Sequence, residues 1–258
     1  MMDLMTMSLL GVVGTFAVEP LAADDKGKEN WDGSVEFSAA SASGNTENTV
    51  LGLKLDARRV LGRYTHDVAA GANYAESTTR DDDGEDVSAV TQDNWFARYR
   101  MEIQTGDRTF IYGRARYEQD SFSGFESRAF LGAGLGHSLI ENDRTTWDVL
   151  AGPGVQYTVL ETPEGPVPED FEDSETEFAL YAGSDLNWTL RENVAIEHDL
   201  DVTYSEENTT LSTEAAIKTK LTEALSSRLS YKVTHETDPP VGREATDSLL
   251  RASIALGF

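Results

Sequence analysis

The carboxy-terminal stretch Thr246-Asp-Ser-Leu-Leu-Arg-Ala-Ser-Ile-Ala-Leu-Gly-Phe258 decides the fold class of this chain. Alternate residues of a strand share a face, and here Phe258, Leu256 and Ile254 share one face while Arg251 lies on the other. A helix of this sequence would mix the two kinds of side chain around its circumference. An amphipathic last strand that ends on an aromatic residue is typical of bacterial outer-membrane barrels. The stretch therefore predicts a transmembrane β-barrel.

Length and composition limit the classes of protein that this chain can belong to. Its 258 residues suit one large barrel. The chain carries 46 aspartate and glutamate residues against 21 lysine and arginine residues, a net charge of −25. This excess of acid argues against a nucleic-acid partner, because nothing offsets the repulsion from phosphate. The absence of cysteine excludes a disulfide framework and thiolate metal sites.

The amino terminus resembles an export signal. An apolar run from Leu9 to Val18 precedes a sharply polar stretch that begins at Asp24. This pattern predicts a signal peptide over residues 1–23, a short polar segment over 24–30 and a barrel over 31–258, although no basic residue precedes the apolar run. The alternative is an amino-terminal tail without regular structure. Later apolar runs are shorter than the ~18 residues of a transmembrane helix, so a membrane-spanning chain would cross with strands.

From Trp31 onward, short segments with period-two alternation are separated by polar or glycine-containing stretches. Twelve such segments predict an all-β fold, a single up-and-down antiparallel transmembrane barrel of about 12 strands. Pro153 lies inside the seventh segment, where a bulge would explain its missing N–H. Short turns on one rim and long loops on the other are typical of membrane barrels, with the short rim in the periplasm. The predicted short turns are Leu61–Arg63, Gln104–Arg108, Glu141–Arg144, Arg191–Asn193 and Thr222–Ser226, and the predicted long loops are 77–89, 161–175 and 237–245.

The alternation alone leaves open a soluble ligand-binding β-barrel with an apolar interior. Three observations favour lipid outside and water inside. Twelve strands are expected to enclose more space than side chains can fill, since about eight strands already give a side-chain-filled interior. Aromatic residues on the apolar face fall near both strand ends, which predicts two aromatic belts; they are Tyr64, Trp147 and Trp188 at the short turns, and Tyr74, Trp95, Tyr117, Tyr157 and Tyr204 at the loops. The opposite face carries charges of both signs, which suits a wet lumen; the predicted lumen residues are Arg98, Arg100, Arg114, Arg116, Glu197, Asp199, Asp201 and Arg251.

Several short runs together resemble one family. They are Trp31-Asp-Gly-Ser-Val-Glu36 followed by Ser43-Gly-Asn-Thr46, Tyr117-Glu-Gln-Asp-Ser-Phe122, Ala151-Gly-Pro-Gly154 and His235-Glu-Thr-Asp-Pro-Pro-Val-Gly-Arg243. As a set they look like the DUF481 family of bacterial outer-membrane proteins, and the likeness covers the chain from Trp31 to Phe258. The resemblance implies an outer-membrane location and a barrel form. The family has no established reaction or ligand, so the resemblance carries no catalytic residue to this chain.

An outer-membrane lipid-modifying hydrolase is the alternative in the class of enzymes. All four histidines, His66, His137, His198 and His235, fall on the apolar face of their segments. A serine nucleophile needs its base within hydrogen-bond distance, and no histidine is expected to face the lumen. We therefore predict no catalytic residue, no cofactor and no enzymatic activity. An acidic run in the loop 77–89 is a weak candidate for a divalent cation such as calcium, although a solvated loop explains it as well; its members are Asp81, Asp82, Asp83, Glu85 and Asp86.

The expected function is that of a structural protein or a small channel in the outer membrane, with acidic extracellular loops. The arginines of the lumen predict either an anion-selective constriction or ion pairs that hold the lumen closed. The expected partners are outer-membrane lipid and lipopolysaccharide, divalent cations at the acidic loops, and the barrel-assembly machinery through the strand that ends at Phe258. Parity also predicts that Ile254→Arg destabilises the fold more than Ser253→Arg, because Ser253 would face luminal water.

Overall fold

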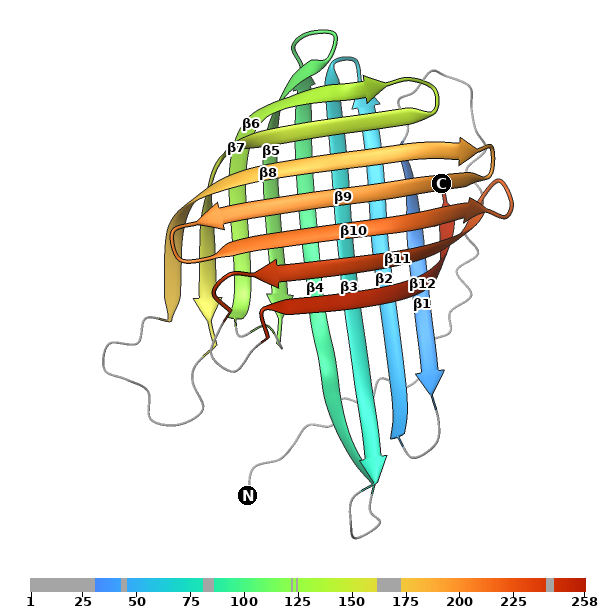
Figure 1. The fold of residues 1–258 in the computed structure, drawn as a ribbon, viewed down its shortest axis with the longest axis vertical. Coiled ribbons are helices and arrows are strands. Elements are labelled where there is room, and N and C mark those ends of the chain that lie inside the picture. Colours follow the sequence, from blue (N-terminus) through green and yellow to red (C-terminus); the bar gives the residue numbers. More distant parts are fainter. Residues whose placement is uncertain are drawn as a thin grey trace.

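The computed structural model describes residues 31–42, 46–80, 86–121, 123, 125–161, 173–239 and 244–258. The predicted signal peptide and the polar segment after it lie outside these ranges. Twelve strands form in the described residues (Figure 1); they are β1 (Asp32–Ala42), β2 (Thr46–Leu61), β3 (Tyr64–Arg80), β4 (Asp86–Gln104), β5 (Thr109–Asp120), β6 (Phe125–Glu141), β7 (Thr145–Leu160), β8 (Ser174–Arg191), β9 (Val194–Ser205), β10 (Thr209–Lys220), β11 (Leu225–Glu236) and β12 (Thr246–Gly257). No helix in this part of the chain is long and apolar enough to cross a membrane.

The strands form one closed up-and-down barrel, as the sequence predicts. Each strand pairs with its neighbours along the chain, and β1 pairs with β12 to close the sheet. Every pairing is antiparallel, and the closing pair is held at its end by Gly33 and Phe258, which exchange backbone hydrogen bonds of 3.0 and 3.1 Å. The terminal aromatic residue therefore belongs to the closing ladder itself.

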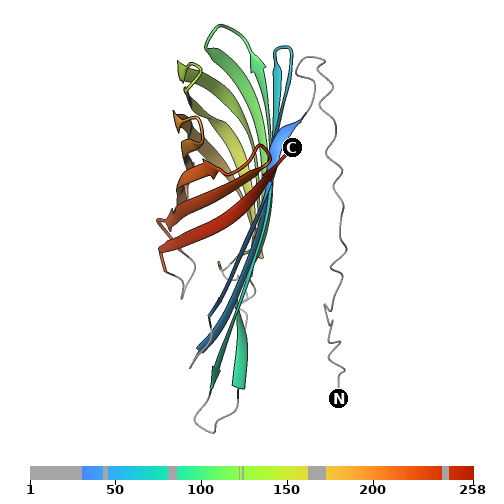
Figure 2. The same ribbon diagram turned by 90° about the vertical axis from the view of Figure 1, so that its right-hand side faces the viewer.

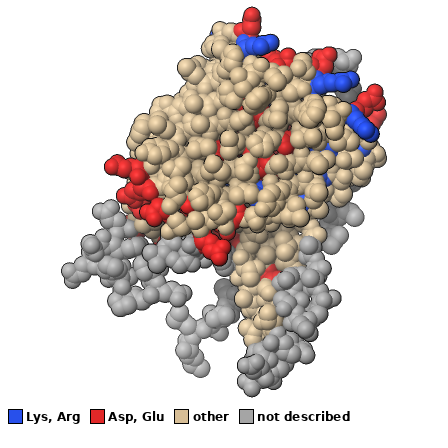
Figure 3. Space-filling view, in the orientation of Figure 1, with Lys and Arg blue, Asp and Glu red and all other residues tan. Residues whose placement is uncertain are grey.

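Apolar side chains cover the outside of the barrel, because alternate residues of each strand point outward. Leu135 is 70% exposed and Phe178 is 66% exposed. We call this surface the outer belt; its members include Leu53, Leu131, Leu135, Phe178, Ile217, Leu250 and Ile254. Figure 3 shows the same surface as a largely uncharged wall between two charged rims. Such a wall is costly in water, which speaks against the alternative of a soluble barrel.

The predicted aromatic residues are all exposed on this outer wall. On β3, Tyr64 lies near the short-turn end and Tyr74 near the loop end. Trp147 and Trp188 join Tyr64 at the short-turn rim, while Tyr157 lies near the loop rim. Two aromatic levels on one apolar face are the arrangement of a lipid-facing surface.

The strands extend further into the predicted loops than the sequence suggested. The predicted loop 77–89 is wrong for most of its length, because β3 continues to Arg80 and β4 begins at Asp86. Thr78 and Ser88 face each other across this extension, with 2.6 Å between their hydroxyl oxygens. Similarly, β7 ends at Leu160 and β8 begins at Ser174, so the predicted loop 161–175 is shorter than expected. Threonine and valine favour strands even when they lie among charged residues.

Short connections join β2 to β3, β4 to β5, β6 to β7, β8 to β9 and β10 to β11. The start of β1 and the end of β12 lie at this same rim. The opposite rim, which we call the loop rim, carries the longer connections. Not all of its turns are long, however. Ser205 donates its backbone N–H to the carbonyl of Asn208 at 2.9 Å, so β9 and β10 are joined by a tight turn.

Register shifts occur near the ends of strands. They lie at Ala75/Glu76 in β3, at Phe125/Ser127 and Ser138/Ile140 in β6, and at Thr189/Arg191 in β8. The bulge predicted at Pro153 is wrong, because the β6–β7 register is the same before and after it. Instead, Gly134 and Gly152 let the two backbones approach closely: a Cβ on either glycine would clash with a backbone carbonyl oxygen of the other strand.

Candidate functional site: the barrel lumen

The lumen has an open part and a filled part. The open part is a cavity of about 770 Å³ that begins at the loop rim and ends partway along the barrel. We call it the vestibule; its wall includes Lys54, Arg98, Arg116, Asp199, Glu236 and Arg251. All of these side chains come from the inward parity of their strands. The filled part lies between the vestibule and the short-turn rim.

Four arginines on β4 and β5 lie in two directly opposed pairs. Arg98 faces Arg116 across the ladder, and Arg100 faces Arg114. Like charges directly opposite each other destabilise a sheet unless other groups offset them. Arg100, Arg114 and Arg116 have ion pairs that do so.

Carboxylates on distant strands compensate two of these arginines. Arg114 on β5 lies 2.6 Å from Asp201 on β9, and Arg100 on β4 lies 2.5 Å from Asp185 on β8. Neither pair of strands is adjacent in the barrel. Both ion pairs therefore run across the interior rather than along the wall. Charge-assisted bonds of this kind are the strong ones among protein hydrogen bonds.

A tyrosine completes the layer that ends the vestibule. The Tyr181 hydroxyl donates to Asp201, and the guanidinium of Arg114 lies 4.0 Å from the centre of the Tyr181 ring. Arg114 and Tyr181 are almost fully buried, at 5% and 3% exposed. We call Arg114, Tyr181 and Asp201 the floor of the vestibule. A guanidinium held between a carboxylate and an aromatic face is both neutralised and sterically fixed.

Apolar side chains fill the lumen around and beyond the floor. They form one buried cluster of Phe110, Tyr112, Phe130, Leu150, Ala179 and Tyr181. Glycines on the facing strands make room for the rings. A Cβ on Gly136 would clash with the Phe110 ring, and a Cβ on Gly154 would lie 2.5 Å from the Phe130 ring. The aromatic rings thus occupy space that side chains on β6 and β7 would otherwise take.

A second charge cluster lies between β1 and β9–β11. Arg228 lies 2.5 Å from Glu214, 2.9 Å from Glu197 and 3.7 Å from Glu36. Ser253 is 7% exposed and donates a 3.1 Å hydrogen bond to Glu36. The sequence missed this cluster, because Arg228 and Glu36 are far apart along the chain. The expectation that Ser253 faces luminal water is therefore wrong, and the tolerance of Ser253→Arg loses that reason.

The remaining predicted lumen residues lie on the vestibule wall. Arg116 lies 2.5 Å from Glu118 and over the ring of Phe96, at 4.9 Å from its centre. Arg98 and Asp199 both line the vestibule, and no ion pair within 4 Å involves either one in the described part of the chain. The wall thus combines fixed ion pairs with cations and acids that are not tied to one partner.

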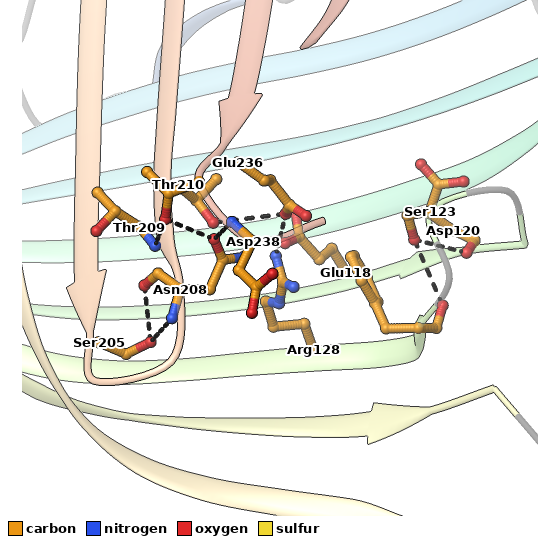
Figure 4. Close-up of polar contacts among 12 residues, drawn as sticks. Glu118, Asp120, Ser123, Arg128, Ser205, Asn208, Thr209, Thr210, Glu236 and Asp238 are labelled. Carbon is orange, nitrogen blue, oxygen red and sulfur yellow. Dashed lines mark hydrogen bonds and ion pairs between the residues drawn. The ribbon is translucent and has the colours of Figure 1, made fainter. Parts of the chain in front are cut away.

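The mouth of the vestibule is also crossed by an ion pair. Arg128 on β6 lies 2.9 Å from Glu236 on β11, and Thr210 points to the same carboxylate at 3.5 Å (Figure 4). Close by, Ser205 and Asn208 bond to each other in the β9–β10 turn. Polar contacts therefore order the mouth without filling it.

The acidic run proposed for a cation stays a prediction. Asp81, Asp82, Asp83 and Glu85 lie outside the described residues, and Asp86 begins β4. Among the residues that the structure describes, no group of three or more His, Asp or Glu side chains could hold a metal ion.

The histidines lie on the outward parity, and three have hydroxyl partners. His66 contacts the Tyr99 hydroxyl at 2.8 Å, and His235 contacts Thr246 at 2.8 Å. His198 is 3.1 Å from the hydroxyl of Thr213. Each partner lies on an adjacent strand, so these contacts have the geometry of cross-strand hydrogen bonds in a lipid-facing wall.

A closed antiparallel barrel with an apolar outer belt, two aromatic levels and a charged lumen is an outer-membrane β-barrel, and its outer belt contacts membrane lipid. A family model described as "Protein of unknown function, DUF481" matches residues 35–258. The chain belongs to the DUF481 family.

One curated relative and several solved structures resemble the chain. The relative is the "Uncharacterized protein YdiY" of Escherichia coli strain K12, which is 26% identical over 258 residues, 95% of this chain and 93% of YdiY. The COG4313 outer-membrane channel of Pseudomonas putida F1 has a TM-score of 0.51 at 11% identity, over 93% of this chain and 100% of that one. The NanC porin has a TM-score of 0.46 at 8% identity, over 87% and 97% of the two chains. The likeness to the channel of P. putida agrees with the fold described above.

Proposed function

We propose that the protein is a small outer-membrane channel whose resting lumen is held nearly closed. The observation that carries this proposal is the floor, where Arg114 and Asp201 meet across the interior at 2.6 Å. A vestibule of about 770 Å³ leads to the floor from the loop rim. A purely structural barrel has no need of a deep vestibule lined by charges of both signs.

The proposed orientation places the loop rim outside the cell. Barrels of the outer membrane keep short turns in the periplasm, and the short turns of this barrel share a rim with both of its ends. Solutes would then enter the vestibule from the exterior. The floor and the apolar cluster beside it would limit their passage.

Conductance in a planar lipid bilayer tests the proposal. The wild-type barrel should show small or rare openings. The double variant Arg114→Ser/Asp201→Ser should conduct several-fold more, because it removes both members of a buried ion pair and leaves no unpaired charge behind. Arg128→Gln/Glu236→Gln at the mouth is the matched control, since it also removes both members of an ion pair, and it should keep the wild-type conductance. Equal conductance of the double variant and the wild type, or none in either, would favour a structural role.

The proposed function is not enzymatic. Its support is that the bonded histidines, His66, His198 and His235, contact Tyr99, Thr213 and Thr246 rather than a serine. Incubation of the refolded barrel with phospholipid tests this point. Hydrolysis that is lost in His66→Ala or His137→Ala would contradict it and revive the hydrolase alternative.

A further inference from the structure

The ladder that closes the barrel is short. Pairing of β1 with β12 runs from Ser34 opposite Gly257 to Phe37 opposite Ile254. The same β1 pairs with β2 as far as Ala42, and β12 pairs with β11 from Thr246 onward. Within the part of the chain that the structure describes, residues 38–42 of β1 and 246–253 of β12 therefore have a strand partner on one side only. We call this open stretch the seam; Figures 1 and 2 both show β1 and β12 meeting near the carboxy terminus and diverging from there.

The seam exposes backbone groups at the level of the membrane. Gly33 and Phe258 exchange backbone hydrogen bonds across the closing ladder. Every second residue of a strand directs its N–H and C=O groups to the same side. Counted from Gly33 and Phe258, Ala39 and Ala252 therefore direct these groups toward the seam, but no ladder pair joins them. Leu250, between the ends of the seam, is 68% exposed on the outer belt. Unpaired backbone groups are costly in hydrocarbon, so the seam is a weak place in the wall.

The vestibule reaches this weak place from inside. Ser248, Leu249 and Arg251 of β12 line the vestibule, and all three lie in the stretch of β12 that β1 does not pair. The cavity therefore extends to the inner side of the seam. Leu249 also gives the inner side of this edge an apolar side chain.

Arg251 spans the seam on the side of the lumen. It extends from β12 past β1 and β2 and donates a hydrogen bond to the side-chain oxygen of Asn73 on β3. It passes over Gly52 on β2, where a Cβ would be in ordinary contact with Nε of Arg251 at 3.6 Å. The partner is a neutral amide, and no ion pair within 4 Å holds Arg251 in the described part of the chain. A cation thus lies beside an apolar opening without a fixed counter-charge.

We propose that the seam is a lateral portal for an anionic single-chain amphiphile of the fatty-acid type. Its carboxylate binds Arg251 inside the vestibule, and its hydrocarbon chain passes beside Leu249 and between β1 and β12 into the bilayer. Arg251 supplies the charge complement of the head group, and the outer belt beside Leu250 supplies the apolar surroundings of the chain. This site does not require conduction through the floor of the vestibule.

Photo-crosslinking in lipid nanodiscs tests the site. The probe is an alkyne-tagged palmitate, and a benzoylphenylalanine replaces Leu249, Leu250 or Gln92. We expect labelling at Leu249 inside the seam and at Leu250 in the lipid, but not at Gln92 on the vestibule wall, because β4 is not next to the seam. Labelling at Leu250 alone would overturn the proposal, because no chain would then enter the seam. Equal labelling at Leu249 and Gln92 would also overturn it, since the probe would then fill the lumen without preference.

Charge variants separate recognition from structural support. Arg251→Gln should weaken labelling at Leu249 about tenfold, the loss expected for one charge-assisted hydrogen bond. Arg251→Lys should retain most of the labelling because it keeps the charge. Asn73→Ala should leave labelling unchanged or raise it, because it frees Arg251 for the carboxylate. Unchanged labelling in Arg251→Gln would refute the assigned role of the arginine.

A disulfide pair measures the seam directly, since the chain has no cysteine of its own. Val35→Cys/Leu256→Cys lies within the closing ladder and should oxidise readily. Ala39→Cys/Ala252→Cys lies two positions beyond the last ladder pair, Phe37 and Ile254. It should oxidise far more slowly, because Cα atoms more than about 7 Å apart cannot be bridged without backbone movement. Equal rates for the two pairs would mean that the strands stay together there and that no portal exists.

Discussion

Leu135→Arg should destabilise the barrel by about 2–4 kcal/mol, the range for arginine on the lipid face at the middle of the bilayer. Its depth follows from the register of β6. Ala129 pairs with Tyr117 of the loop-side aromatic level, and Ile140 pairs with Trp147 of the other level. At about 3.3 Å per residue and a tilt of about 40°, this stretch spans roughly 28 Å, close to the apolar band of about 25 Å in such barrels. Leu135 lies midway along it.

Leu139→Arg is the matched control on the same strand and the same face. Leu139 is 40% exposed and lies at the level of Trp147. The same substitution there should destabilise the fold by only about 0–1 kcal/mol, because the guanidinium reaches the interface. Equilibrium urea unfolding of the barrel in phospholipid vesicles measures both values. Equal losses at the two positions, or no loss at Leu135, would refute the assignment of the outer belt to lipid.

Three further results are expected. Gly134→Ala should destabilise the barrel by about 1–3 kcal/mol, since its Cβ would clash with a β7 carbonyl oxygen. The control Gly113→Ala should change the stability by no more than about 0.5 kcal/mol, because nothing lies within 4 Å of the added atom. Urea unfolding compares the two variants, and equal losses of stability would contradict the close approach of β6 and β7. Deletion of Phe258 should reduce the folded band on unboiled gels, because it removes both backbone bonds to Gly33; an undiminished band would show that closure does not need them. A tag inserted after Gly84 should be reached by antibody on intact cells, and labelling of a tag in the β8–β9 turn instead would invert the orientation.

The sequence predicted the wall of the barrel well, because the wall obeys a local rule. Period-two alternation is legible in any short segment, so Leu135, Phe178 and Ile254 could be assigned to one face from their neighbours alone. The same rule gave the strand number and the closing role of the last strand. The predicted strand ends differ from the observed ones. Thr78 and Ser88 continue the β3–β4 ladder, although the acidic residues next to them had suggested that it would stop.

The arrangement of the lumen could not be predicted to the same depth. The alternation places Arg114 and Asp201 inside the barrel. Their contact joins β5 to β9, which are not adjacent strands, and no local sequence pattern predicts which side chains meet across the interior. The filling of the lumen had a readable signal that was missed. Phe110 lies on the charged parity of β5 and is paired directly with Gly136. A large ring opposite a glycine on the inner face indicates a packed interior rather than an open one.

The register shifts bear on how the family can change its length. Adding one residue inside a strand exchanges its lipid-facing and lumen-facing side chains, so such an insertion would turn charges toward lipid. The shifts at Ala75/Glu76, Ser138/Ile140 and Thr189/Arg191 lie near strand ends, where an extra residue leaves the middle of each strand in phase. Insertions and deletions of a single residue among relatives should therefore occur near the rims. Within the membrane span, residues should be inserted or deleted in pairs.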